Sequence, residues 1–374
     1  MIPVAIPDLS GNETRYVLEA MKSTWISSTG PFIDKFESDF ARLCNTNAAI
    51  TVSNGTVALH LALLALGLEA GDEVIIPSLT YIATANAVKY VGATPVFIDV
   101  DKDNWCLDPN LIKDSITSKT KGIIAVHLYG HPCDMDKINK IAAIHGLWVI
   151  EDAAEAHFAK YKGKCVGSLS KMATFSFYGN KIFTCGEGGA ITLNDKQLEI
   201  RLRMLKGQGM DPERRYYFPI TGYNFRLTNL ASAILCAQIE RKEEIILKRN
   251  LIFNQYYDNL KDIPGIIFQP VSDWAVPAKW LYCILINEKE FGCSRDTLIL
   301  SLKEFNVDTR PFFIPLHKLP PFKKEGVENN VELPVTEELS ECGLNLPTYN
   351  KLFNKEVVYI CNVIRSIHNS YLNA

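Results

Sequence analysis

Apolar residues between positions 48 and 100 form short runs separated by helical stripes. The runs 48–53, 73–78 and 94–100 predict buried strands, and the segments 57–68 and 83–90 between them predict helices. Strands that are apolar on both faces and alternate with helices are typical of a mostly parallel sheet covered on both sides. This part of the chain therefore predicts an α/β domain.

The same alternation continues to residue 152. The run 122–130 predicts another buried strand, 134–146 predicts an amphipathic helix that ends at Gly146, and 147–152 predicts the next strand. In an open α/β sheet, ligands bind beyond the carboxyl ends of the strands. Polar residues at these strand ends are therefore the first candidates for chemistry.

The pattern differs at the two ends of the chain. We expect residues 1–40 to be irregular, because Pro3, Pro7 and Pro31 interrupt them. A long helical stretch is predicted over 229–260, and strands and helices in another order follow it. This change of order indicates a second unit.

The length of the chain, 374 residues, exceeds what one simple core buries, so two domains are expected. We place a large domain, which includes the N-terminal segment, at 1–240, and a smaller α+β domain at 241–374.

Composition excludes several classes of function. Apolar residues make up 47% of the chain and charged residues 22%, and the net charge of −3 does not indicate a surface for nucleic acid or an anionic membrane. No apolar stretch approaches the roughly 18 residues of a membrane span, and the start has no secretory pattern. The ten cysteines are scattered without a CxxC pair, and the histidines lack metal-ligand spacing. We expect a cytoplasmic protein without a metal.

The segment SNGT (53–56) joins the first predicted strand to a helix. Backbone N–H groups at a helix N-terminus attract phosphate, Gly55 permits close approach, and Thr56 adds a hydroxyl donor. A plain strand-to-helix turn capped by serine and asparagine is the alternative.

Asp152 ends the predicted strand 147–152. A carboxylate at this place can hold a pyridine nitrogen protonated, which makes the ring an electron sink. A helix N-cap also explains an isolated aspartate. The neighbouring Glu151 is expected to point to the opposite face of the sheet.

Lys181 lies among aromatic and small residues in FSFYGNK (175–181). Partial burial lowers the pKa of a lysine and frees its amine to attack an aldehyde, and Ser176 offers a further phosphate hydroxyl. The alternative is an exposed loop lysine, against which the surrounding aromatic residues argue. A phosphate turn, an acidic strand end and a buried lysine, in this order, indicate a pyridoxal phosphate enzyme.

Two further residues lie in segments that line pockets in many proteins. Tyr81 follows a strand and is a candidate for stacking on a pyridine face, although an aromatic residue at a strand end is usually part of the core. His317 lies in the proline-rich aromatic loop 311–322, which suits either a substrate pocket or a packed surface loop.

Over essentially its whole length the chain resembles the DegT/DnrJ/EryC1/StrS sugar aminotransferases, which have the aspartate aminotransferase fold. The segments that carry the resemblance are TWISSTGPFIDKFE (24–37), SNGTVALHLAL (53–63), VIEDAAEAH (149–157), FSFYGNK (175–181), GEGG (186–189), GYNFRLTN (222–229) and TRPFFIPLHKLPPF (309–322). The resemblance implies fold type I, with a large mostly parallel sheet domain and a smaller α+β domain, and pyridoxal 5'-phosphate as cofactor.

The resemblance also implies roles for single residues. Lys181 matches the lysine that forms a Schiff base with the cofactor, Asp152 the partner of the pyridine nitrogen, and Glu155 the residue near the phenolic oxygen. The other matches are the phosphate contacts Gly55, Thr56 and Ser176, the ring-stacking Tyr81, and Asn224, which reaches the phosphate from the partner subunit. The last match implies a homodimer with shared sites.

Within the family, segments such as KGQGMDPERRYYFP (206–219) are most similar to members that move an amino group from glutamate to C4 of GDP-4-keto-6-deoxy-mannose, giving GDP-perosamine for polysaccharide biosynthesis. The sequence does not read the nucleotide directly, so a UDP- or dTDP-linked 4-keto-6-deoxy-glucose, giving a viosamine-type product, stays open. One departure from the family is Phe158, where glycine is usual.

Three other functions are compatible with parts of the sequence. C3 dehydratases of the same family carry histidine in place of the lysine, and Lys181 argues against that reaction. A pyridoxal phosphate-binding regulator without turnover is a second alternative, although no helix-turn-helix or basic extension is present. A dinucleotide-dependent dehydrogenase is the third, but no GxGxxG follows the first strand.

Overall fold

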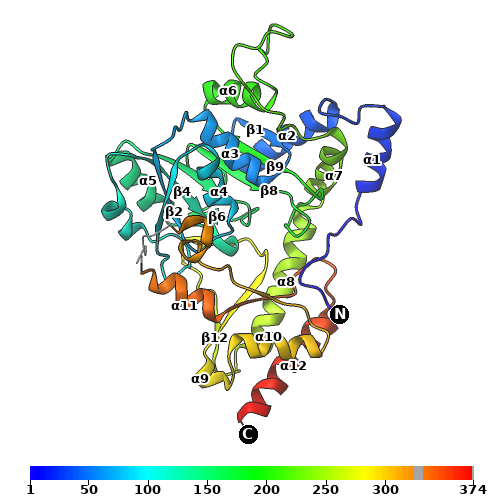
Figure 1. The fold of residues 1–374 in the computed structure, drawn as a ribbon. Helices are drawn as coiled ribbons and strands as arrows, with labels where there is room; N and C mark the ends of the chain where they lie inside the picture. Colours follow the sequence, from blue (N-terminus) through cyan, green and yellow to red (C-terminus); the bar gives the residue numbers. More distant parts are fainter. Residues whose placement is uncertain (324–331, 373–374) are drawn as a thin grey trace.

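The computed structural model describes residues 1–323 and 332–372. Figure 1 shows a large sheet packed among helices, with a smaller sheet below it. Helix α8 (Lys242–Leu260) runs from the larger unit to the smaller one. Within the described ranges, no helix is long and apolar enough to cross a membrane.

The large sheet has seven strands. Their order across the sheet is β1 (Ala48–Val52), β9 (Gly189–Leu193), β8 (Met172–Ser176), β5 (Trp148–Asp152), β4 (Thr120–Val126), β2 (Glu73–Pro77) and β3 (Thr94–Ile98). The strands from β8 to β3 pair in parallel, and only the pairs that involve β9 are antiparallel. The predicted mostly parallel α/β fold is thereby confirmed.

Both faces of this sheet are buried. In β2, Val74 and Ile76 belong to one hydrophobic cluster, whereas Ile75 between them belongs to the other. Successive side chains of a strand point to opposite faces, so the continuous apolar runs of the sequence fill two cores at once.

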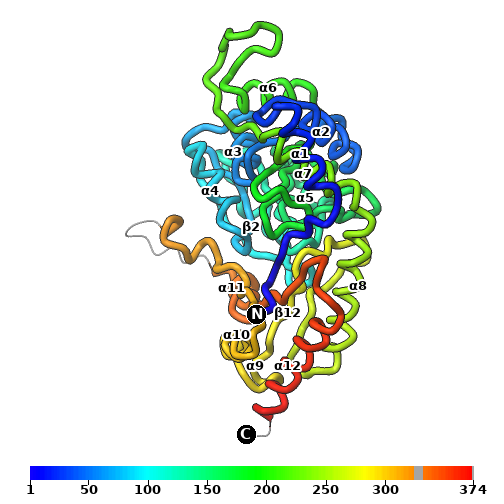
Figure 2. Tube along the Cα trace, turned by 90° about the vertical axis from the view of Figure 1, so that its right-hand side faces the viewer, coloured from blue at the N-terminus to red at the C-terminus, as the bar shows by residue number. Residues whose placement is uncertain are grey.

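The two cores are closed by different helices. Helices α3 (Gly55–Ala65), α4 (Ala83–Tyr90) and α6 (Lys196–Lys206) supply one cluster, and α2 (Pro31–Cys44), α5 (Met135–Ile144) and α7 (Asn229–Glu240) supply the other. Figure 2 shows that the segment between α6 and α7 projects as an arm from the top of the molecule.

Two expectations about helices were wrong. Residues 1–40 are not irregular: α1 (Glu13–Lys22) and α2 form there, and Pro31 occupies the first turn of α2. Proline is accepted at that position, because its missing N–H would have no partner in the helix. The stretch 229–260 is two helices, because Arg241 leaves the helical conformation with φ −100° and ψ 12°.

The smaller sheet is antiparallel and has the order β10 (Ile266–Phe268), β12 (Tyr282–Ile286), β14 (Gly343–Leu346) and β13 (Arg310–Pro311). Around it lie α8, α9 (Glu288–Phe291), α10 (Arg295–Glu304), α11 (Pro334–Cys342) and α12 (Asn354–Leu372). A third hydrophobic cluster fills this unit.

Two contacts cross the expected division at residues 240 and 241. Ile2 pairs with Val307, so the start of the chain lies against the smaller unit (Figure 2). Strand β11 (Ala275–Val276) pairs with β6 (Lys160–Tyr161), which in turn pairs with β7 (Lys164–Cys165). The domain boundary itself stays a prediction.

Candidate active site

The turn from β1 into α3 forms a cradle for an anion. Asn54 caps α3 by accepting a hydrogen bond from the backbone N–H of Val57 at 2.9 Å. A Cβ atom at Gly55 would lie 2.7 Å from the Cβ of Ser176, so only glycine allows these two segments to approach. The first N–H groups of the helix, at Gly55 and Thr56, thus lie beside the hydroxyl of Ser176. This combination attracts a phosphate group.

Asp152 is the last residue of β5 and is buried. Its Oδ2 accepts a hydrogen bond from Thr84 Oγ1 at 2.8 Å, and its Oδ1 accepts one from the backbone N–H of Ala154 at 3.2 Å. Burial raises the pKa of Asp152, while these two donors and the charge of Lys181 oppose the rise. The carboxylate is therefore held ready for a cationic or protonated partner.

Lys181 and Glu155 form a buried pair. Lys181 Nζ lies 3.9 Å from Glu155 Oε1 and 3.9 Å from the ring centroid of Trp280. Burial lowers the pKa of Lys181, and the carboxylates of Glu155 and Asp152 oppose this. Burial raises the pKa of Glu155 to about 7, against the charge of Lys181 and a hydrogen bond from the backbone N–H of Tyr129 at 2.7 Å. The two shifts bring the pKa values of this acid and this base closer together, which favours proton exchange between them.

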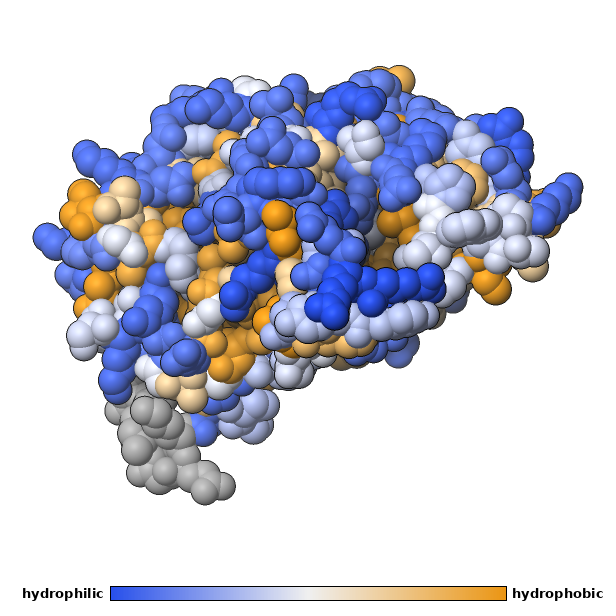
Figure 3. Space-filling view, turned by 90° about the horizontal axis from the view of Figure 1, so that it is seen from above, coloured by the Kyte–Doolittle hydropathy of each residue, from blue (hydrophilic) through white to orange (hydrophobic). Residues whose placement is uncertain are grey.

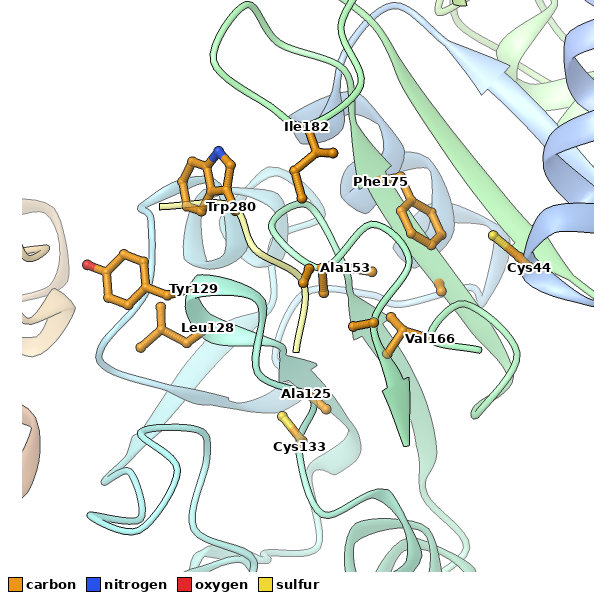
Figure 4. Packing of buried hydrophobic residues seen from close by; sticks show 14 of the residues in the cluster. Cys44, Ala125, Leu128, Tyr129, Cys133, Ala153, Val166, Phe175, Ile182 and Trp280 are labelled. Carbon is orange, nitrogen blue, oxygen red and sulfur yellow. The ribbon is translucent and has the colours of Figure 1, made fainter. Parts of the chain in front are cut away.

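The loop that carries Lys181 is held from both units. Its backbone N–H donates to the carbonyl of Tyr178 at 2.9 Å, and Trp280 Nε1 donates to the carbonyl of Asn180 at 2.8 Å. In Figure 4, Ala153, the neighbour of Asp152, lies between Trp280 on one side and Phe175 on the other. The smaller unit thus helps to fix the position of the lysine.

Tyr81 and His317 lie in different surroundings. Tyr81 is 59% exposed, and its ring makes a tilted contact with Phe313 at a centroid distance of 5.9 Å. His317 is buried, with Nδ1 at 2.7 Å from Ser78 Oγ and Nε2 at 3.1 Å from Glu337 Oε1. A ring face is therefore open at Tyr81, whereas both nitrogens of His317 already have protein partners.

Asn224 is exposed and forms a β-bridge with Gly207, where the segment between α6 and α7 begins and returns. Its Oδ1 accepts a hydrogen bond from Arg226 Nε at 3.1 Å, and the carbonyl of the next residue, Phe225, accepts one from the backbone N–H of Ser53 at 2.9 Å. The segment thus lies beside the phosphate turn of its own chain. Within the described residues, the Asn224 side chain makes no hydrogen bond with that turn or with Ser176.

The turn after Asp152 keeps a backbone suited to glycine although it carries Phe158. The φ of Phe158 is 70°, in the left-handed region. A residue with a Cβ is disfavoured there by roughly 1–2 kcal/mol relative to glycine. The phenyl ring packs edge-on against Phe183 at 4.6 Å. The departure from the family therefore changes the side-chain packing and keeps the turn.

The sequence did not single out three groups that touch the predicted residues. Thr84 lies in the first turn of α4, the helix that follows β2. A hydroxyl residue just after a strand of a parallel sheet could have been recognised as a candidate from the sequence. The backbone N–H of Tyr129 and the indole of Trp280 carry no sequence signal, because they reach the site only through tertiary packing.

These residues fit pyridoxal phosphate. The close contact of Gly55 with Ser176 leaves an N–H-lined cradle for a phosphate. Asp152 supplies a buried carboxylate, and Lys181 supplies a buried amine whose pKa is lowered. A flat, anionic aldehyde needs these three groups together.

Comparisons with known proteins agree with this chemistry. Residues 7–365 match the DegT/DnrJ/EryC1/StrS aminotransferase family. The chain is 48% identical to a GDP-perosamine synthase of Caulobacter vibrioides, covering 95% of each chain, and 45% identical to one of Escherichia coli O157:H7, covering 98% of this chain and 99% of the other. The solved structure of DesV from S. venezuelae is 33% identical, covers 98% of this chain and 99% of that one, and superposes with a TM-score of 0.90.

Family, fold and site chemistry lead to one assignment. The match spans nearly the whole chain, the large sheet is mostly parallel as the sequence predicted, and Lys181 is buried beside Glu155. The chain belongs to the DegT/DnrJ/EryC1/StrS aminotransferase family and is a pyridoxal phosphate-dependent enzyme of fold type I.

Proposed function

We propose that this protein transfers the amino group of glutamate to C4 of GDP-4-keto-6-deoxy-mannose, giving GDP-perosamine. The observation that carries the proposal is the identity of 45% and 48% with two proteins named GDP-perosamine synthase, over 98% and 95% of this chain. Lys181 in the site supports amino transfer over the dehydration at C3 that a histidine would favour.

Lys181 is the residue that holds and moves protons in this proposal. Bound pyridoxal phosphate supplies an aldehyde for amine condensation and a ring that accepts electrons from the reacting carbon. The lowered pKa of Lys181 increases the share of free amine at neutral pH, so Nζ can first attack a carbonyl and later carry a proton. Glu155, at 3.9 Å, receives or returns that proton.

Asp152 and Glu155 act on different atoms of the cofactor in the proposal. Asp152, fixed by Thr84 and Ala154, accepts a hydrogen bond from the protonated ring nitrogen. Glu155, fixed by the N–H of Tyr129, would interact with the phenolic oxygen of the bound cofactor. A buried carboxylate and a buried carboxyl whose pKa is about 7 can share these tasks, because their surroundings differ.

The remaining predicted residues bind and orient. Gly55, Thr56 and Ser176 hold the phosphate, and the exposed ring of Tyr81 stacks on the pyridine face. We place Asn224 on the phosphate of a partner subunit, because its side chain is exposed where the arm begins and returns, which implies a homodimer. His317, with Ser78 and Glu337 on its nitrogens, shapes the sugar pocket through its position.

The experiment compares three nucleotide sugars. Enzyme loaded with cofactor is incubated with glutamate and with GDP-4-keto-6-deoxy-mannose, UDP-4-keto-6-deoxy-glucose or dTDP-4-keto-6-deoxy-glucose, and mass spectrometry and NMR identify the product. We expect a 4-amino sugar and 2-oxoglutarate, with the highest kcat/KM for the GDP sugar. The Lys181→Ala variant, analysed in parallel, should form none.

Two results would contradict the proposal. A higher kcat/KM for the UDP or dTDP sugar would show that the proposed substrate is wrong, while the proposed amino transfer would stand. Loss of the sugar's oxygen at C3 without incorporation of nitrogen would replace the reaction itself. Aspartate and alanine in place of glutamate test the donor in the same assay.

A further inference from the structure

A cavity outside the predicted active site lies between α8 and the segment 275–279. Its volume is about 200 Å³, and Arg249, His157, Ile182 and Lys279 contribute to its wall. None of the residues predicted to bind the cofactor lines it. The cavity therefore needs its own explanation.

Arg249 is a buried cation without a counterion. Arg249 is only 5% exposed, and its Nη1 donates hydrogen bonds to the carbonyls of Lys279 at 3.0 Å and Trp280 at 2.9 Å. Nε has no hydrogen-bond partner, and no carboxylate among the described residues lies within 4.0 Å of the guanidinium. Burial lowers the pKa of Arg249 to about 10, so the group stays charged at neutral pH. An unpaired buried charge is costly, and an anion would offset that cost.

His157 is a second polar group without a partner at this cavity. It is 1% exposed, and neither ring nitrogen has a hydrogen-bond partner. Burial, with the charges of Lys181 and Arg249, lowers its pKa to about 3 against an opposing backbone contact with Ser176, so the ring is neutral and carries one N–H donor. A neutral donor beside an unpaired guanidinium suits an anionic ligand.

The rest of the wall excludes a cation and favours a short carbon chain. No aspartate or glutamate lines the cavity, and Lys279 adds a second amine whose pKa is lowered by burial. The side chains of Phe158, Ile182 and Val276 supply apolar surface. Two basic groups and apolar side chains in the wall of one cavity suit a short ligand with two acidic ends.

We propose that this cavity binds a small dicarboxylate, with one carboxylate on the free Nε edge of Arg249 and His157, and the other towards Lys279. The free edge of a guanidinium binds a carboxylate with two parallel hydrogen bonds. The site is separate from the one that binds the nucleotide sugar, so it stands or falls independently of the proposed substrate.

The test uses the holoenzyme and succinate, which has neither the amino group nor the keto group needed for transamination. Isothermal calorimetry at constant ionic strength measures the affinity, with acetate and chloride as comparisons. We expect one succinate per chain, bound more tightly than acetate. Arg249→Lys keeps the charge but removes the two-pronged edge, and should weaken succinate binding at least tenfold.

A second variant tests the site without touching the buried arginine. Val276 is 58% exposed at the cavity wall, so Val276→Trp should fold and fill the space, and it should weaken binding to a similar degree. Lys248→Gln, on the same helix but outside the cavity wall, should leave the affinity unchanged.

Three results would overturn the proposal. Absence of succinate binding to the wild-type holoenzyme would mean that the cavity holds only water. Equal affinity in wild type and Val276→Trp would place the succinate elsewhere. Competition with glutamate that both cavity variants leave intact would place it in the active site.

Discussion

At the scale of single residues, burial decides the chemistry of this site. Asp152, Glu155 and Lys181 are ordinary acidic and basic residues whose pKa values are shifted by removal from water, and each shift is limited by a named partner. Such opposed shifts within one cluster are typical of groups that exchange protons.

Asp152→Asn should fold and bind the cofactor but transaminate slowly. A neutral amide cannot keep the ring nitrogen protonated, and loss of such an electrostatic partner costs about 100- to 1000-fold in rate. Single-turnover kinetics with glutamate measure the effect. Thr84→Val removes one hydrogen bond to Oδ2 and keeps the carboxylate, so it should cost only about tenfold, on the order of 1.5 kcal/mol. A near-normal rate in Asp152→Asn would mean that Asp152 is only a helix cap.

His157 should make the fold sensitive to acid. Its pKa in the folded protein is lowered to about 3, so below the ordinary value near 6.5 the unfolded chain takes up a proton that the folded chain does not. Stability is therefore lost as the pH falls from about 6.5 towards 3, by up to about 1.4 kcal/mol per pH unit.

The check compares thermal unfolding of wild type and His157→Gln between pH 7 and pH 5 in a chloride buffer. The variant should lose less stability than the wild type over this range. His145→Gln, at an exposed position, should behave as the wild type does. Parallel curves for wild type and His157→Gln would show that other groups cause the acid sensitivity.

At the scale of elements, the turn after β5 combines a conformation suited to glycine with a bulky side chain. The φ of 70° at Phe158 is retained while its ring packs on Phe183. The left-handed backbone at Phe158 lowers the stability of the fold, whereas the packing of its ring raises it. Substitutions at this position can measure the two effects separately.

Phe158→Gly should be more stable than Phe158→Ala, which reverses the usual order. Both variants lose the contact with Phe183, but only glycine relieves the left-handed backbone, a difference of about 1 kcal/mol. Urea unfolding measures both variants. At Phe183, which has no positive φ, alanine should be the more stable replacement. A more stable alanine variant at position 158 would show that the backbone there is not strained.

At the scale of the whole molecule, the open question is where the arm segment acts. Tyr216 is 73% exposed, and Figure 3, which looks down on this end, shows hydrophobic side chains exposed between hydrophilic ones. The Phe225 carbonyl accepts a hydrogen bond from the backbone N–H of Ser53 in the same chain, whereas the Asn224 side chain accepts one from Arg226 Nε. This arrangement is compatible with the proposed homodimer, in which Asn224 contacts the phosphate of the partner subunit.

Mixing Lys181→Ala with Asn224→Ala chains should restore transamination if sites are shared. In a mixed dimer, one of the two sites then has Lys181 from one chain and Asn224 from the other. Differential tags isolate the mixed dimer, and product formation is measured. Mixing Lys181→Ala with Asp152→Asn is the matched control and should restore nothing, because both residues belong to one chain's site. Mixed dimers without activity would place Asn224 in its own chain's site or outside any site.

The sequence determined the parts of this protein that depend on local pattern. Apolar runs and helical stripes located the parallel strands to within a few residues and gave the bounds of α4, because strand and helix periods are properties of adjacent positions. Short motifs marked Gly55, Asp152 and Lys181, since a phosphate turn, a strand end and a lysine in an aromatic segment carry their own signal. The same reasoning failed for residues 1–40, because Pro31 begins a helix there and does not interrupt one. It also failed at Arg241, where one residue with non-helical dihedral angles divides the predicted helix and has no breaker signal in the sequence.

Only the tertiary structure decided which groups surround those residues. Trp280 contacts Lys181, and the N–H of Tyr129 donates to Glu155, although both come from other segments of the chain. Thr84, in α4, donates to Asp152 at the end of β5. The cavity at Arg249 exists because α8 passes the turn of His157. Burial, counterions and hydrogen-bond partners are set by contacts between distant segments, and these contacts control pKa values and binding, so no local pattern could state them.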